Sequence, residues 1–169
     1  MMATTHIAAG AASAALAATS LSASGPQLVL MLGGGVLGSL LPDIDHPQSS
    51  FGRRVLPVSM TLAAIFGHRG ITHSLLAIAG VSWLIWYAMS AMSVHPGLYV
   101  PFVIGLGVGY LSHLAGDWIT NSGVPLLWPS KRRFVSPIRI FTGDAIEHLI
   151  AAGIYAWMIT YSVRRFSNV

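Results

Sequence analysis

The stretch LPDIDHP, residues 41–47, holds two of the five acidic residues of the chain and a histidine, directly after an uncharged run at residues 28–40. Carboxylates in alternate positions, here Asp43 and Asp45, can bridge two metal ions or bind one ion while orienting a histidine. A polar turn in which an aspartate caps the next element would use the same residue types. The metal interpretation is favoured because aspartates at the end of an apolar segment are costly unless they are paired.

The stretch HLAGD adds an imidazole and a carboxylate, His113 and Asp117, four residues apart. Residues at this spacing share one face of a helix, so the pair can clamp zinc, manganese or iron. A hydrogen bond at a helix end is the alternative. Ionisable groups within an apolar segment favour the ligand interpretation, because they are expensive there and mark functional sites.

The stretch GHRGITHS carries His68 and His73 on either side of Arg69. Either histidine can bind a metal ion. The planar guanidinium of Arg69 can hold a phosphate through paired hydrogen bonds, and the same residue suits a determinant of membrane topology.

The remaining acidic residues and histidines allow several interpretations. In DAIEH, Asp144 followed by Glu147 is typical of a helix N-cap with a reciprocal partner three residues on, and both are also potential ligands. His148 suits a surface or supporting role, and His46 either a ligand or a residue that supports one. His95 lies in a separate short loop and is expected to be exposed.

The composition indicates a protein whose outer surface faces lipid. The chain is 54% hydrophobic and only 8% charged, whereas soluble domains carry about 25% charged residues. Cysteine is absent, so any metal must be held by His, Asp or Glu. The net charge of +4 comes from clusters beside apolar segments, which suit anionic lipid headgroups; no specific nucleic acid is expected as a partner.

The elements that must position these side chains are five expected helices in one domain, residues 1–169, which predict an all-α polytopic membrane bundle. Their expected ranges are Thr4–Leu21, Gln27–Leu41, Ile71–Met92, Leu98–Thr120 and Asp144–Ser162. The last three are long enough to span a bilayer, whereas Gln27–Leu41 is short for it and Val58–Gly67 suits a buried or re-entrant piece. Two G-x-x-x-G pairs, at residues 34/38 and 105/109, predict close helix packing.

The distribution of basic residues predicts the orientation. Seven of the nine lie in the two long loops and none in SVHPG, so the long loops should be cytoplasmic, although Arg164 and Arg165 then fall outside. No basic residue precedes Arg53, so the positive region of a signal peptide is missing. All five acidic residues and six of the seven histidines then converge on the cytoplasmic end of the bundle.

Four motifs, THIAAG, LPDIDHPQSSFGRR, FGHRGITHSLLA and GYLSHLAGDWITNSGVPLLWP, resemble those of the LexA-regulated, membrane-bound, predicted metal-dependent hydrolase family of the bacterial inner membrane. That family is thought to be distantly similar to zinc-dependent phospholipase C and the zinc single-strand nucleases, which are all-helical. The resemblance implies a similar metal site at one end of the bundle. The candidate metal ligands are His6, Asp43, Asp45, His68, His73, His113, Asp117 and Glu147.

The expected activity is hydrolysis of a phosphate ester, with a phospholipid or another phosphodiester as substrate. One to three divalent ions, zinc in the first place and manganese as an option, would activate water, and ions about 3.5–4 Å apart suit this chemistry. Asp43, Asp45 and Arg69 are the candidate catalytic residues, with either aspartate able to take the proton of the attacking water. A non-catalytic metal-binding protein, an ion transporter and a purely structural cluster are the alternatives.

Overall fold

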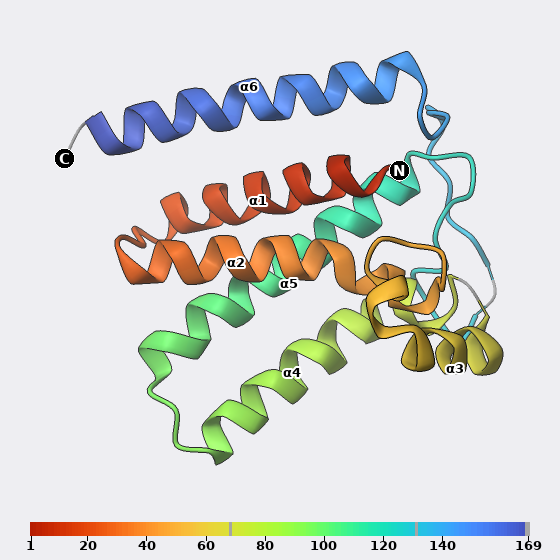
Figure 1. The fold of residues 1–169 in the computed structure, drawn as a ribbon, viewed down its shortest axis with the longest axis horizontal. Helices are drawn as coiled ribbons and strands as arrows, with labels where there is room; N and C mark the ends of the chain where they lie inside the picture. The colour runs from red at the N-terminus through yellow and green to blue at the C-terminus, as the bar shows by residue number, and fades with distance from the viewer. Residues whose placement is uncertain (68, 131, 168–169) are drawn as a thin grey trace.

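A computed structural model of the chain describes residues 1–67, 69–130 and 132–167 (Figure 1). The elements in chain order are α1 (Ala3–Ser20), α2 (Pro26–Leu40), the 3-10 helices η1 (Leu41–Asp45) and η2 (Gly52–Val55), α3 (Leu56–Phe66), the 3-10 helix η3 (Ile71–His73), α4 (Leu75–Ala91), α5 (Pro96–Trp118) and α6 (Ala145–Ser167). Strand-like pairing among the described residues is limited to the isolated bridges Thr120–Ile140 and Val124–Phe134. The all-α class is confirmed, with six α-helices in the described part where the sequence suggested about five.

Helices α2 and α5 form the centre of the fold and run in the same direction. Their backbones approach closely because small residues lie between them. A Cβ atom added to Gly38 would collide with the carbonyl oxygen of Leu106, and one added to Gly109 with that of Gly35. The two G-x-x-x-G pairs therefore serve helix packing within this chain. This packing brings the C-terminal ends of α2 and α5 together.

Helix α1 lies antiparallel to α2 and is also packed through small residues. A Cβ atom at Gly10 would lie 2.6 Å from Cβ of Ser39, and one at Gly35 would lie 2.5 Å from Cβ of Ala14. Further along, Ala18 packs with Met31 in a buried apolar cluster. The N-terminal end of α1 thus reaches the C-terminal ends of α2 and α5.

The long connections meet at this same end of the bundle (Figure 1). Helix α4 leads away from it, α5 returns to it, and α6 starts there and lies along α1. Two tyrosines of α6 hold this last contact, since Tyr155 and Tyr161 donate hydrogen bonds to the carbonyl oxygens of Thr4 and Ala15. We call the end that carries residues 41–74 and 119–144 the loop end.

Two helices are long and apolar enough to cross a membrane: α2 continued by η1, Pro26–Asp45, and α5. Helix α2 itself has the short length expected for Gln27–Leu41, 15 residues, and the segment reaches 20 residues only when the 3-10 helix η1 is counted with it. The expected helix Ile71–Met92 is shortened to the 17 residues of α4, because Ser74 is extended and its hydroxyl accepts a hydrogen bond from the N–H of Ala77. Helix α6 has 23 residues but carries Glu147, Arg164 and Arg165, and it is not among these two.

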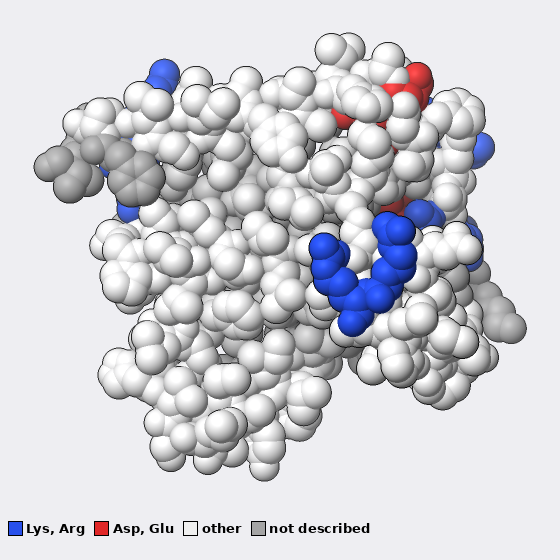
Figure 2. All heavy atoms as spheres, in the orientation of Figure 1, with Lys and Arg blue, Asp and Glu red and all other residues white. Residues whose placement is uncertain are grey.

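The surface pattern agrees with a lipid-facing bundle. In the face shown in Figure 2, charged side chains gather at the loop end and near the C-terminal tip of α6, and the body between them is uncharged. Large apolar side chains are exposed on this body, including Trp83 and Leu84 of α4 and Leu149 of α6.

Candidate metal centre

The loop end buries a cluster of imidazoles and carboxylates contributed by α1, η1, η3 and α5. His6, Asp45, His73, His113 and Asp117 are each no more than 2% exposed. The side chain of Asp43 is 22% exposed and gives the cluster its contact with solvent. These separate stretches converge because α2 and α5 pack in parallel and α1 packs antiparallel to α2.

His113 is oriented by the backbone of the neighbouring helix. Its Nδ1 lies 2.6 Å from the carbonyl oxygen of Ser39, so Nδ1 carries the proton and donates it. The ring then presents the lone pair of Nε2 to the cluster. A backbone carbonyl on the other ring nitrogen is the usual way in which proteins fix a metal-binding histidine.

The Nε2 atoms of two histidines face the same two carboxylates. His73 Nε2 lies 3.7 Å from Asp43 Oδ1 and 3.7 Å from Asp117 Oδ2. His113 Nε2 lies 3.7 Å and 3.8 Å from the same two atoms. For comparison, two ligands about 2.1 Å from a tetrahedral zinc ion lie about 3.4 Å apart. The separations are therefore close to those of ligands around a shared ion.

Asp117 also contacts a second group of residues through its other oxygen. Asp117 Oδ1 lies 3.3 Å from His6 Nε2 and 2.9 Å from the amino group of Met1. The ring of His6 stacks on that of His113, with centroids 3.7 Å apart. His6, His113 and Asp117 form one triad of potential ligands, and Asp43, His73 and His113 form another. A carboxylate between two triads suits a bridge between two ions.

Asp45 lies on the opposite side of His73 from Asp43. Its Oδ2 atom is 3.7 Å from His73 Nδ1, accepts a hydrogen bond from the N–H of Arg69 at 2.9 Å, and accepts another from the hydroxyl of Thr72. Asp43 thus faces Nε2 of His73, and Asp45 faces its Nδ1. The ligand and catalytic roles assigned to Asp45 stay predictions.

Arg69 connects two of the three aspartates of the cluster, Asp45 and Asp117. Its N–H donates to Asp45, and its Nη2 lies 3.0 Å from Asp117 Oδ2. The residue holds a φ angle of 59°, in the left-handed region, which costs an L-residue about 1–2 kcal/mol. Such strain concentrates at functional sites, where the surrounding contacts enforce it.

Glu147 stands apart from both triads. Its carboxylate accepts hydrogen bonds from the N–H groups of Met2, at 2.6 Å, and Gly143, at 2.7 Å. Burial raises the pKa of Glu147, but the hydrogen bonds from Gly143, Met2 and the Thr5 side chain, together with the charge of the Met1 amino group, lower it by more, so the pKa lies below its usual range. The position supports a role in joining the start of α6 to the start of α1, and the predicted ligand role stays a prediction.

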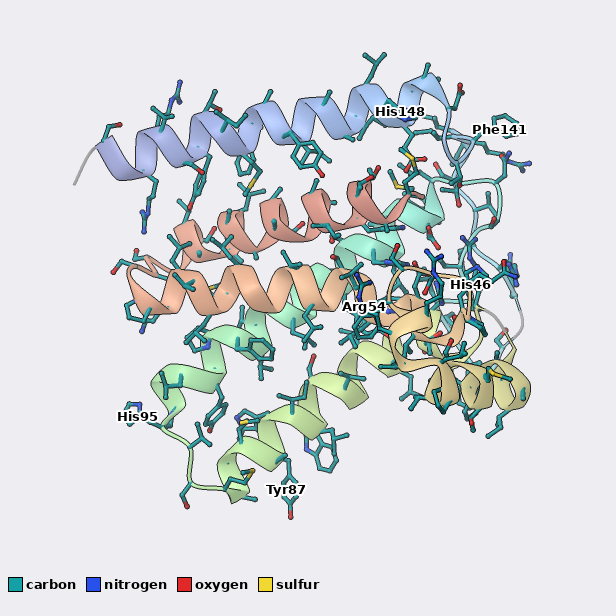
Figure 3. All side chains as sticks on the ribbon, viewed as in Figure 1. His46, Arg54, Tyr87, His95, Phe141 and His148 are labelled. Atoms are coloured by element: carbon teal, nitrogen blue, oxygen red, sulfur yellow. The ribbon has the colours of Figure 1, made fainter. Side chains whose placement is uncertain are left out.

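The other candidates lie outside the cluster or outside the described residues. His68 is not among the described residues. Asp144 Oδ1 accepts a hydrogen bond from the N–H of Ala145, the next residue, whereas an N-cap side chain accepts from an N–H two or three residues on. The Glu147 carboxylate accepts from Gly143 instead of Asp144, and His148 is exposed beside them. Figure 3 shows His46 and His148 at the loop end and His95 at the far end, where His95 caps α5 by accepting from the N–H of Gly97.

Three residues that support the site were not found from the sequence. Thr72 joins Asp45 to the η3 turn, and the hydroxyl of Tyr110 donates to the carbonyl oxygen of Thr72 at 2.6 Å. Ser39 contributes only its carbonyl group to His113. The spacing of Tyr110, three residues before His113 on α5, is the one signal in the sequence that could have indicated a shared face.

The donor set fits a divalent metal ion. It consists of imidazole nitrogens and carboxylate oxygens, which suit zinc and also manganese. The buried Nε2 atom of His113, which faces carboxylate oxygens of both Asp43 and Asp117, has no hydrogen-bond partner among the described residues. A buried polar atom without a partner is costly, and an ion would provide one. The residues that would hold it are Asp43, His73, His113, Asp117 and His6.

The fold and the cluster define an all-helical, membrane-type protein with a candidate metal centre at one end. The model of the YdjM inner membrane protein family matches residues 1–167, so the chain belongs to this family of inner membrane proteins. YdjM of Escherichia coli (strain K12) is 41% identical over 127 residues, which are 73% of this chain and 62% of YdjM. The chain thus spans less than two thirds of that relative.

Two further relatives extend the comparison. YvsG of Bacillus subtilis (strain 168) is 38% identical over 153 residues, which are 89% of this chain and 87% of YvsG. The inner membrane protein YbcI of Escherichia coli (strain K12) is 34% identical over 113 residues, 65% of this chain and 60% of YbcI. No solved structure shows a significant match.

Proposed function

We propose that the protein is a metal-dependent hydrolase that cleaves a phosphate ester, with a phospholipid as its substrate, at the cytoplasmic face of the inner membrane. The observation that carries this proposal is the placing of His73 Nε2 and His113 Nε2 against carboxylate oxygens of both Asp43 and Asp117. The resemblance of the motifs to the LexA-regulated metal-dependent hydrolase family supports the same activity.

The chemistry divides between the cation and the side chains. A divalent cation, zinc in the first place, supplies a Lewis acid for the phosphoryl oxygen and lowers the pKa of an attacking water. Asp43 is the open carboxylate of the cluster, at 22% exposure, and is placed to take the proton of that water. Asp45 is fully buried and accepts hydrogen bonds from the N–H of Arg69 and the hydroxyl of Thr72, so we assign it a role in ordering the site.

A lipid substrate is supported by an apolar cavity beside the cluster. The cavity has a volume of about 440 Å³, and its walls come from η1, α3, η3, α4 and α5. Thr72 and Tyr110 line it, and Thr72 donates a hydrogen bond to Asp45. An acyl chain lying in this cavity would bring its headgroup to the carboxylates.

The cytoplasmic position is supported by charge. Every basic residue between Arg53 and Arg139 that the structure describes belongs to the two connections at the loop end, and cytoplasmic loops of membrane proteins are enriched in such residues. Helices α2 and α5 run in the same direction, so the proposal requires the connection through the 17-residue helix α4 to return the chain across the membrane between them. We therefore propose a multi-pass protein with its site at the headgroup level.

A transporter would need polar residues along a path to the other side of the membrane. In the described part of the chain the candidate ligands gather at the loop end, and only His95 lies at the far end. Hydrolysis is therefore the function that the arrangement supports best.

The proposal is tested with the purified protein in lipid nanodiscs, loaded with zinc or manganese and assayed on phospholipids and on a model phosphodiester. We expect metal-dependent cleavage that Asp43→Ala and His113→Ala abolish and that the exposed control His148→Ala retains. Wild-type protein that cleaves none of these substrates, or an Asp43→Ala variant as active as the wild type, would overturn the proposal.

A further inference from the structure

Besides the apolar cavity, a smaller cavity with arginines in its lining adjoins the candidate metal centre. It has a volume of about 250 Å³ and lies between the turn after α3 and the connection that follows α5. Arg69 and Arg133 both line it, and none of the described residues that line it is acidic. We call it the Arg69–Arg133 pocket. Two guanidinium groups at one small cavity indicate an anionic ligand.

The guanidinium of Arg69 connects this pocket to the cluster and keeps donors available. Its Nη2 lies 3.0 Å from Asp117 Oδ2. Its Nε and Nη1 atoms are buried and have no hydrogen-bond partner among the described residues. Buried donors of a charged group are expensive to leave without partners. A ligand with several acceptor oxygens would satisfy them.

Arg133 reaches the pocket from a loop that is held at two points. The N–H of Val124 donates to the carbonyl oxygen of Phe134 at 3.0 Å, and the N–H of Phe134 donates back to Val124 at 2.9 Å. Arg133 uses one of its donors within the loop, where Nη1 donates to the carbonyl oxygen of Ser122 at 3.1 Å. The side chain is otherwise exposed, so most of its fork can meet a ligand.

The two sides of the pocket are joined by an aromatic contact. Phe66, the last residue of α3, meets Trp128 edge to face with ring centroids 6.2 Å apart, and both line the cavity. This contact ties the connection after α5 to the segment that leads to Arg69. The segments that carry Arg69 and Arg133 are therefore packed against each other.

We propose that the Arg69–Arg133 pocket binds a phosphoryl group of the substrate, and that Arg133 is a substrate-positioning residue of the site. Phosphate oxygens match the planar forks of two guanidinium groups, and the link from Arg69 to Asp117 places such a group beside the cluster. The inference rests on the proposed function for the identity of the ligand as substrate. Binding of phosphate itself does not require hydrolysis.

The test measures binding of radiolabelled inorganic phosphate to the metal-loaded full chain in nanodiscs of neutral lipid. We expect Arg133→Ala to weaken binding about tenfold or more, as befits the loss of paired charge-assisted hydrogen bonds. Arg133→Lys, which keeps the charge and loses the fork, should recover only part of the affinity. Arg132→Ala is the matched control, because Arg132 is the adjacent exposed arginine and lies over the ring of Phe134 instead.

Two results would overturn the proposal that the Arg69–Arg133 pocket binds a phosphoryl group. Equal weakening by Arg132→Ala and Arg133→Ala would mean general attraction to a basic loop. Binding that chelation abolishes and Arg133→Ala leaves unchanged would mean that the metal alone holds phosphate, and in that case the proposed hydrolase would still stand. Conversely, the expected binding pattern without any hydrolysis would support the pocket and remove the proposed function.

A competition arm separates the two sources of the phosphoryl group. Short-chain phosphatidic acid is added to the labelled phosphate, with the wild type and with Arg133→Ala. If phosphatidic acid displaces the label at a much lower concentration than unlabelled inorganic phosphate does, the pocket is assigned to a lipid headgroup. Displacement only at equal concentration would assign it to a phosphate group irrespective of its carrier, and both results support a phosphoryl site.

Discussion

His113 and Ser39 are joined by a hydrogen bond of 2.6 Å from the ring Nδ1 to the backbone carbonyl oxygen, across the interface of α5 and α2. The bond links the helix packing to the chemistry of the site. It requires the two helices to stay in contact near their C-terminal ends, and it leaves Nε2 of His113 facing the carboxylates. Changes in helix packing should therefore change the site without touching a ligand.

The first prediction concerns Gly109, whose added Cβ atom would collide with the carbonyl oxygen of Gly35. We expect Gly109→Ala to lower the midpoint of thermal unfolding in detergent, because overpacking of this kind costs about 1–3 kcal/mol. Gly107→Ala is the control on the same helix, since its Cβ atom would lie 3.7 Å from Ser82 Oγ, an ordinary contact. Equal midpoints for the two variants would contradict the close packing.

Metal content provides the second prediction. We expect purified wild-type protein to retain zinc or manganese, and Asp43→Ala, His113→Ala and Asp117→Ala each to lose most of it, because these residues supply the facing ligand atoms. His95→Ala should keep the wild-type content, since His95 lies at the far end of the bundle. Elemental analysis after dialysis measures this. A metal-free wild type would leave the cluster as a purely structural feature.

The two aspartates of the PDID motif should behave differently, which is the third prediction. In chelator-treated protein, Asp45→Ala should be strongly destabilised, because the buried hydroxyl of Thr72 loses its acceptor at about 1–3 kcal/mol and the part-buried N–H of Arg69 loses its acceptor as well. Asp43→Ala should unfold nearly like the wild type under the same conditions, because Asp43 is partly exposed. Thermal unfolding in detergent compares the two, and a larger loss for Asp43→Ala would reverse the roles assigned to them.

Arg69 allows a fourth prediction that separates its backbone from its side chain. Because its φ angle is 59°, Arg69→Gly should be more stable than Arg69→Ala by about 1 kcal/mol, since only glycine adopts this region without strain. Both variants lack the guanidinium and should be equally impaired in binding inorganic phosphate. Chemical unfolding and phosphate binding, measured on the same preparations, test the two parts independently.

Much of the fold could be predicted because long apolar segments specify helices through composition alone. The expected ranges for α1, α2, α5 and α6 agree with the structure to within a few residues, and the placing of His6, Asp43, His73, His113 and Asp117 at one end followed from segment direction. The start of α4 was less predictable, because Ser74 ends one helical turn and caps the next. Membership of an inner membrane protein family confirms the membrane assignment.

The roles of neighbouring residues could not be predicted from the sequence. Asp43 and Asp45 would share one face of an extended segment but point in different directions from a helix, and the sequence did not show that they lie in the 3-10 helix η1. Arg133 gave no signal beyond its basic cluster, because its place at the pocket depends on the pairing of residues 124 and 134. Contacts between segments far apart in the chain determine such details.

The last prediction tests the orientation in the membrane. The chain has no cysteine, so single cysteines can be introduced without background labelling. Ser50→Cys reports on the loop end and His95→Cys on the far end; both positions are exposed. We expect a membrane-impermeant maleimide added to intact cells to label His95→Cys and to label Ser50→Cys only after the inner membrane is permeabilised, because the basic loop end should face the cytoplasm. Labelling of Ser50→Cys in intact cells would place the cluster on the outer side, and a substrate supplied from the cytoplasm could then no longer reach it.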